Sequence, residues 1–120
     1  MPVTREAIET FQIVEGGRHD FKEQVDLDSE LGKAKFVDEV VAFLNVGHGH
    51  LIIGVKEKKG RFAGWHPVPI AGDDFDAFAN KVQQIVKSCI DPVPLGISVH
   101  PIEREGGLAV DVAIGQHRMQ

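Results

Sequence analysis

Residues 47–64 read GHGHLIIGVKEKKGRFAG, and the expected architecture is built around them. Its apolar, β-branched run at 50–56 predicts a buried strand, and Lys-Gly at 59–60 predicts a tight turn into a second strand over 61–65. Immediately before the stretch, apolar side chains recur at helical spacing over about 33–45. The chain therefore passes from a helix into a buried strand and then into a hairpin whose tip is rich in lysine and arginine.

Outward from this stretch, helices and strands alternate. Thr4 is a candidate N-cap for a short helix, and Asp73 and Asp74 are candidate caps for a second long helix that ends before Asp91-Pro92. We expect an α+β fold, a two-layer sandwich of a mixed or antiparallel sheet with two main helices plus a short N-terminal helix. The remaining expected elements are a helix over 5–11 and strands over 20–25, 96–103 and 108–114.

Length and composition limit the classes of protein to which the chain can belong. The 120 residues fit a single domain, and the 42% hydrophobic and 26% charged fractions are those of an ordinary globular protein. No apolar run reaches the length of a membrane span, and the N-terminus lacks the pattern of a secretory signal, so we expect a cytoplasmic location. The single cysteine, Cys89, lies at helical spacing with Val82, Ile85 and Val86, which predicts a core thiol.

The charge is unevenly distributed along the chain. The net charge is −5, yet residues 31–65 hold six Lys or Arg against three Asp or Glu. Most of this excess is a tight group of bases able to contact phosphate oxygens. The plain alternative is a solvated hairpin tip. The candidate phosphate-binding residues are Lys56, Lys58, Lys59 and Arg61, joined by Lys22 on the predicted strand 20–25.

Three carboxylates are candidates for a metal site. Glu15 and Asp20 flank Gly16-Gly17, so a sharp loop is able to bring them together at the start of a strand. Glu57 follows the strand at 50–56 and would reach them if the two strands are neighbours. Hard oxygen donors suit Mg²⁺ or Mn²⁺, which can activate water and stabilise charge on phosphorus. Solvated acids with no chemical role are the alternative.

The glycine-rich turn after the helix at 33–45 has two interpretations. Gly47 and Gly49 are able to end the helix, because glycine takes positive φ without steric cost. Alternatively, their bare N–H groups form a small anion cradle. The spacing of a P-loop is absent, so ATP binding is poorly supported.

Together these motifs resemble the AlbA_2 domain of the Schlafen family. The residues that carry the resemblance are Glu15 with Asp20-Phe21-Lys22, then Ala42-Phe43-Leu44-Asn45, Gly47-His48-Gly49, LIIGV at 51–55 and Gly64. The resemblance implies a domain that binds DNA or RNA, acts as a homodimer, and is often the N-terminal module of bacterial multidomain proteins. A chain of 1–120 would then be a candidate fragment of a longer protein.

The resemblance also bears on catalysis. Schlafen-type nucleases use three acidic residues, and the resemblance carries two of them onto Glu15 and Asp20. The third is allowed at Glu57 but not required there, because Lys56 stands first after the strand. Asp20 replaces the more usual glutamate, and His48 stands where the family prefers glycine.

Three functions remain open at this point. The leading hypothesis is a nucleic-acid-binding domain whose bases contact the phosphate backbone. The alternative is a Mg²⁺- or Mn²⁺-dependent endoribonuclease in which Glu15, Asp20 and Glu57 hold the metal and perform catalysis. The third is a protein-interaction or adaptor domain.

Overall fold

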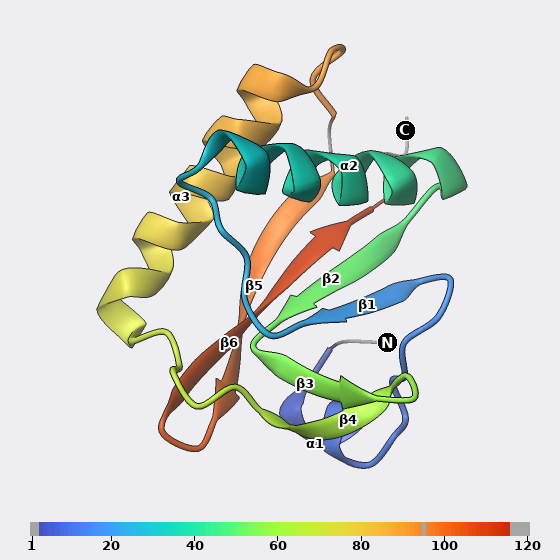
Figure 1. The fold of residues 1–120 in the computed structure, drawn as a ribbon, viewed down its shortest axis with the longest axis vertical. Helices are drawn as coiled ribbons and strands as arrows, with labels where there is room; N and C mark the ends of the chain where they lie inside the picture. The colour runs from blue at the N-terminus through green and yellow to red at the C-terminus, as the bar shows by residue number, and fades with distance from the viewer. Residues whose placement is uncertain (1–2, 95, 116–120) are drawn as a thin grey trace.

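A four-stranded sheet forms the centre of the molecule (Figure 1). The computed structural model describes residues 3–94 and 96–115. The strand order is β1-β2-β6-β5, in which β1 and β2 run parallel and the other pairs are antiparallel, while β3 and β4 form a separate hairpin. The expected α+β fold with a mixed sheet is confirmed. In chain order the elements are α1 Arg5–Glu9, β1 His19–Lys22, α2 Glu30–Val46, β2 Gly49–Ile53, β3 Val55–Lys58, β4 Arg61–Trp65, α3 Gly72–Cys89, β5 Ile97–Arg104 and β6 Gly107–Ile114.

One face of the sheet packs against α2 and α3, which lie across it in Figure 1. Leu51 and Val112 are cross-strand partners on this face, and both side chains are fully buried. The helical stripe expected from the sequence supplies Phe36 and Val40 on α2, and α3 contributes Val82. Burying each such side chain contributes roughly 1.5–3 kcal/mol, so this layer is the main source of stability.

The opposite face carries a smaller core. Phe21 and Ile52 face α1 and the hairpin, where Ile8 and Val55 are buried against them. Trp65, at the end of β4, donates a 2.7 Å hydrogen bond from its indole Nε1 to the Glu9 carboxylate. The hairpin is therefore attached to α1 by both apolar packing and a polar contact.

The expected single strand at 50–56 is wrong, because Gly54 divides it into β2 and β3. Gly54 has φ of 106°, and a Cβ on it would lie 3.2 Å from the Cβ of Ala109. Its N–H donates to the Lys22 carbonyl at 2.7 Å, and its own carbonyl accepts from His66 N–H at 2.8 Å. The chain bends here so that β3 leaves the central sheet and pairs with β4.

The ends of the helices follow the sequence in part. Ser29 caps α2 by accepting from the N–H of Gly32 at 3.0 Å. Gly47 ends α2 with φ of 108°, which supports the helix-ending role of this glycine. The predicted caps of α3 are wrong: Ala71 stands at its N-cap without a side-chain hydrogen bond. Asp73 and Asp74 lie in the first turn, where negative charge interacts favourably with the helix dipole.

The core position predicted for Cys89 is also wrong. Its thiol is exposed, while Val82, Ile85 and Val86 are buried. Cys89 is the last residue of α3, and the residue after it, Ile90, packs against the core instead. Helical spacing identified the buried face correctly as far as Val86 but not at the last residue of the helix.

Among the described residues, none of the helices is both long enough and apolar enough to cross a membrane.

Candidate functional site

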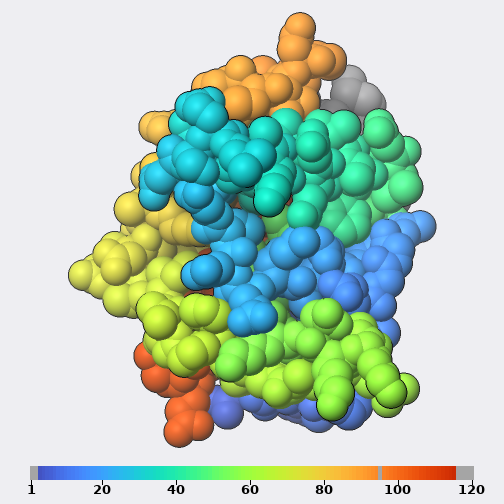
Figure 2. Space-filling view, viewed as in Figure 1, coloured from blue at the N-terminus to red at the C-terminus, as the bar shows by residue number. Residues whose placement is uncertain are grey.

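The basic hairpin is built by its turn. Lys59 and Gly60 both have positive φ, 54° and 81°, which is the geometry of a tight two-residue hairpin turn. Lys58 and Arg61 are cross-strand partners beside it. The hairpin lies at the lower right of the molecule, below β1, in the space-filling view (Figure 2). Its exposed bases are Lys56, Lys58, Lys59 and Arg61.

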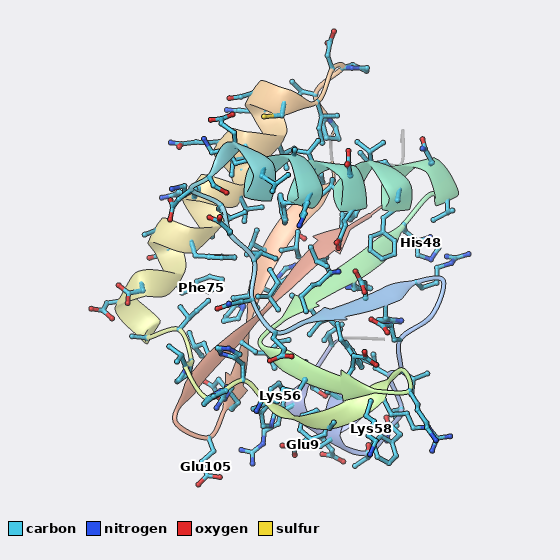
Figure 3. All side chains as sticks on the ribbon, viewed as in Figure 1. Glu9, His48, Lys56, Lys58, Phe75 and Glu105 are labelled. Atoms are coloured by element: carbon cyan, nitrogen blue, oxygen red, sulfur yellow. The ribbon has the colours of Figure 1, made fainter. Side chains whose placement is uncertain are left out.

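These bases are available to an anion. Within residues 3–94 and 96–115, the ion pairs of the structure involve none of the four bases. Figure 3 labels Lys56 and Lys58 along the hairpin, together with Glu9, which contacts the hairpin at Trp65. Glu9 is occupied by Arg5 and by the Trp65 indole, and the Trp65 hydrogen bond is the main cause that lowers the pKa of Glu9. The hairpin therefore presents positive charge that no described acid neutralises by direct contact.

Phe11 extends this surface, and no sequence pattern pointed to it. It follows α1 with φ of 61°, a left-handed conformation that costs a bulky residue roughly 1–2 kcal/mol. Its side chain is 50% exposed. The Arg61 guanidinium lies over the ring, with Cζ 5.6 Å from the ring centroid. Phe11, Lys58, Lys59 and Arg61, together with Phe62 and Ala63, line a shallow hollow of about 530 Å³.

Glu15 and Asp20 do come together, as predicted. Glu15 accepts a 3.1 Å hydrogen bond from the N–H of Phe21, the residue that follows Asp20 on β1. Burial is the main cause that raises the pKa of Glu15, and hydrogen bonding to the Asp20 carboxyl raises it further. Burial likewise raises the pKa of Asp20, with a further contribution from the Glu39 carboxyl. Burial therefore makes the charged form of both carboxyls less favourable than it is in water.

Glu39 is the acid that the sequence analysis missed. It lies on α2 between the buried residues Phe36 and Val40, and its Oε1 accepts from the Lys22 ammonium at 2.9 Å. Lys22 also lies 3.5 Å from Asp20 Oδ2, and the Glu39 hydrogen bond is the main cause that raises the pKa of Lys22. Among the residues that the structure describes, the Oε2 atom of Glu39 is buried and has no hydrogen-bond partner. Its position within an apolar helical stripe is the sequence feature that could have identified Glu39 as a site residue.

Glu57 does not join this cluster. Its Oε2 accepts the N–H of Gly60 at 2.9 Å and so stabilises the hairpin turn. In the part of the chain that the structure describes, no three His, Cys, Asp or Glu side chains are arranged to hold a metal ion. The Lys22 ammonium occupies the position beside Asp20 and Glu39 where a cation would be expected. The donor set present does not fit Mg²⁺ or Mn²⁺.

A second polar group lies at the other end of β1 and β2. His50 Nδ1 contacts both oxygens of the buried Asp111 at 3.0 and 3.2 Å, and the His19 ring stacks on His50 with centroids 5.2 Å apart. Burial is the main cause that lowers the pKa of His19. His48, labelled in Figure 3, instead contacts Arg18 at 2.8 Å. His48 and His50 therefore have different partners.

Comparison with known proteins identifies the family of this chain. The model of the family described as Schlafen, AlbA_2 matches residues 15–119. The chain belongs to the Schlafen AlbA_2 family. The matched range of this AlbA_2 domain includes the hairpin and the carboxylate cluster, whereas α1 and Phe11 precede it. No curated protein sequence matches the chain significantly.

Two solved structures share the fold of this AlbA_2 domain. The N-terminal domain of an ATP-dependent DNA helicase RecG-related protein from Nitrosomonas europaea is 23% identical, with a TM-score of 0.54. The match covers 92% of this chain and 70% of that one. The DIP2311 protein from Corynebacterium diphtheriae is 21% identical, with a TM-score of 0.50, over 84% of this chain and 18% of that one. At these identities the likeness concerns the fold alone.

Proposed function

We propose that this AlbA_2 domain binds nucleic acid through phosphate contacts made by the β3–β4 hairpin. The observation that carries the proposal is the exposed group Lys56, Lys58, Lys59 and Arg61, which forms no ion pair with the rest of the described chain. Each phosphate that such a base neutralises releases counterions, which drives binding even for a protein with net negative charge. The family membership and the helicase-related name of one structural neighbour are consistent with this role.

Lys22 is the base that fits this role least well. Its ammonium is held by Glu39 and Asp20, so contact with a phosphate would require these ion pairs to break. We therefore assign the phosphate contacts to the hairpin and a structural role to Lys22, which joins the edge strand β1 to α2. A single hairpin offers few contacts, and we propose that a homodimer doubles them, as the resemblance implies.

The salt dependence of binding tests the proposal. For a single strand, the slope of log K against log salt is about −0.7 for each neutralised phosphate. Replacing Lys58, Lys59 and Arg61 with glutamine should reduce the slope by about 2, from three contacts at about 0.7 each. Fluorescence anisotropy with labelled oligo(U) between 50 and 200 mM salt, roughly the range where such losses are large, measures it. Sedimentation velocity on the same samples reports whether the domain is a dimer.

A matched control removes the same charge elsewhere. The control replaces Lys33, Lys35 and Lys87 with glutamine, because these bases lie on α2 and α3 and not on the hairpin. It should keep the wild-type slope. Equal slopes for the two triple variants would contradict the proposal, and no salt-sensitive binding in the wild type would point instead to a protein-interaction domain.

Metal-dependent cleavage is not favoured by the geometry. Glu57 is engaged by the hairpin turn and Lys22 is inserted among the other carboxylates. We therefore expect the labelled RNA to remain intact when Mn²⁺ is added. Cutting that requires Mn²⁺ and is lost in Glu15→Gln would contradict this expectation and restore the endoribonuclease hypothesis.

A further inference from the structure

Phe11 stands at a position where another residue would suit the fold better. It follows α1 with φ of 61°, where glycine would fit without strain, and half of its apolar ring faces solvent. Both features are costly in the free domain. A strained residue that is also an exposed aromatic is an indication of function when its surroundings suggest a ligand.

The surroundings of Phe11 suggest a ligand with both a flat ring and negative charge. The Arg61 guanidinium lies over the ring at 5.6 Å, and Lys58 and Lys59 line the same hollow. Phe62 contributes a second aromatic side chain to the wall of the hollow. Aromatic and guanidinium planes beside a basic groove are the parts with which proteins bind single strands, because bases stack on them while phosphates contact the cations.

We propose that Phe11 and Arg61 form a stacking site for one base of a single-stranded nucleic acid. This inference rests on the proposed function and specifies its ligand. In a duplex the faces of a base are covered by its neighbours, whereas an unstacked base can lie on the exposed ring while the flanking phosphates reach the hairpin lysines. The site thus selects single strands without reading their sequence.

Three substitutions at Phe11 test the site. Phe11→Gly removes the ring and relieves the positive φ, so the domain should be as stable as wild type or more stable. Its affinity for 12-residue oligo(U) or oligo(dT), whichever the wild type binds, should nevertheless fall about 10-fold, with the salt slope unchanged. Affinity for an RNA duplex of the same length should change less than about 2-fold. Phe11→Leu, which keeps an apolar side chain but no ring, should behave like Phe11→Gly.

Phe11→Trp should preserve binding and report it. Its indole should be quenched by the single strand, beyond any change that Trp65 shows in the wild type. Leu31→Ala is the matched control, because Leu31 is 67% exposed on α2 and lies outside the hollow. It should bind like wild type. Uridine monophosphate should not compete at the same nucleotide concentration, and equal competition would assign the site to a free nucleotide and overturn the single-strand proposal.

The outcomes separate this inference from the function on which it rests. Wild-type affinity in Phe11→Gly, together with a reduced salt slope in the hairpin triple variant, would overturn the stacking site and leave the phosphate contacts intact. Equal losses for single strand and duplex in Phe11→Gly would also overturn it. An unchanged slope in the triple variant would instead overturn the proposed function itself.

Discussion

Replacing Gly49 with alanine is expected to destabilise the domain by about 1–3 kcal/mol, the usual cost of overpacking a core. A Cβ on Gly49 would lie 2.5 Å from Cε1 and 2.6 Å from Cγ of Phe43. Real Cβ atoms do not approach an aromatic ring so closely, and the ring cannot move away freely, since Phe43 is only 8% exposed. The cost is steric and not conformational, because Gly49 lies in β2 without a positive φ.

Urea unfolding followed by the fluorescence of Trp65 measures this cost. Gly17→Ala is the matched control, because a Cβ there would have no described atom within 4 Å apart from those of Gly17 and its two chain neighbours. Phe43→Leu should relieve the clash, so the double variant should be more stable than the sum of the two single effects by at least about 0.5 kcal/mol. A Gly49→Ala domain within about 0.5 kcal/mol of Gly17→Ala would refute the argument, because surface changes commonly fall in that range.

Two further predictions concern pH and charge. Burial lowers the pKa of the His19 imidazole, so stability is full above the unfolded pKa near 6.5 and is lost as the pH falls from there towards the lowered folded pKa. Replacing His19 with glutamine should reduce the difference in unfolding free energy between about pH 5.5 and 7.5 by up to about 1 kcal/mol. Urea unfolding at both pH values measures this, and an unchanged difference would contradict it. Burial raises the pKa of the Glu15 carboxyl, so the charged form is disfavoured in the folded state and stability is lost as the pH rises through the raised pKa. Replacing Glu15 with glutamine should therefore raise the unfolding free energy at pH 7, by no more than about 1 kcal/mol. A loss of stability, or an equal gain from Glu23→Gln at an exposed acid, would count against this prediction.

Local patterns predicted the elements whose cause is local. The apolar stripe of α2 predicted that Phe36 and Val40 would be buried, and the Lys-Gly pair predicted the hairpin turn. The break at Gly54 was not predictable from its neighbours in sequence. It depends on a hydrogen bond to the Lys22 carbonyl and on the close approach of Ala109, both of which are distant along the chain.

The same distinction applies to the candidate site. The basic tip was predictable, because a two-residue turn fixes which side chains are exposed. The partner of Lys22 was not, because Glu39 meets it only when α2 packs over the edge strand β1. The position of Glu57 on the hairpin was predictable, but its partner was not. Its carboxylate accepts the N–H of Gly60 in the same turn and does not reach Glu15 or Asp20.

Glu15 connects the two parts of the candidate site, and this changes how its variants should be interpreted. Its backbone N–H donates to the Gly60 carbonyl in the hairpin turn at 2.7 Å, while its side chain accepts from Phe21 N–H on β1. Removing the side chain in Glu15→Ala would free the loop that holds the hairpin tip beside the sheet. Loss of RNA binding or cleavage in that variant would therefore not identify Glu15 as catalytic. Glu15→Gln keeps an acceptor for Phe21 and removes the charge, so only activity lost in Gln as well as Ala would indicate that the carboxylate itself takes part in chemistry.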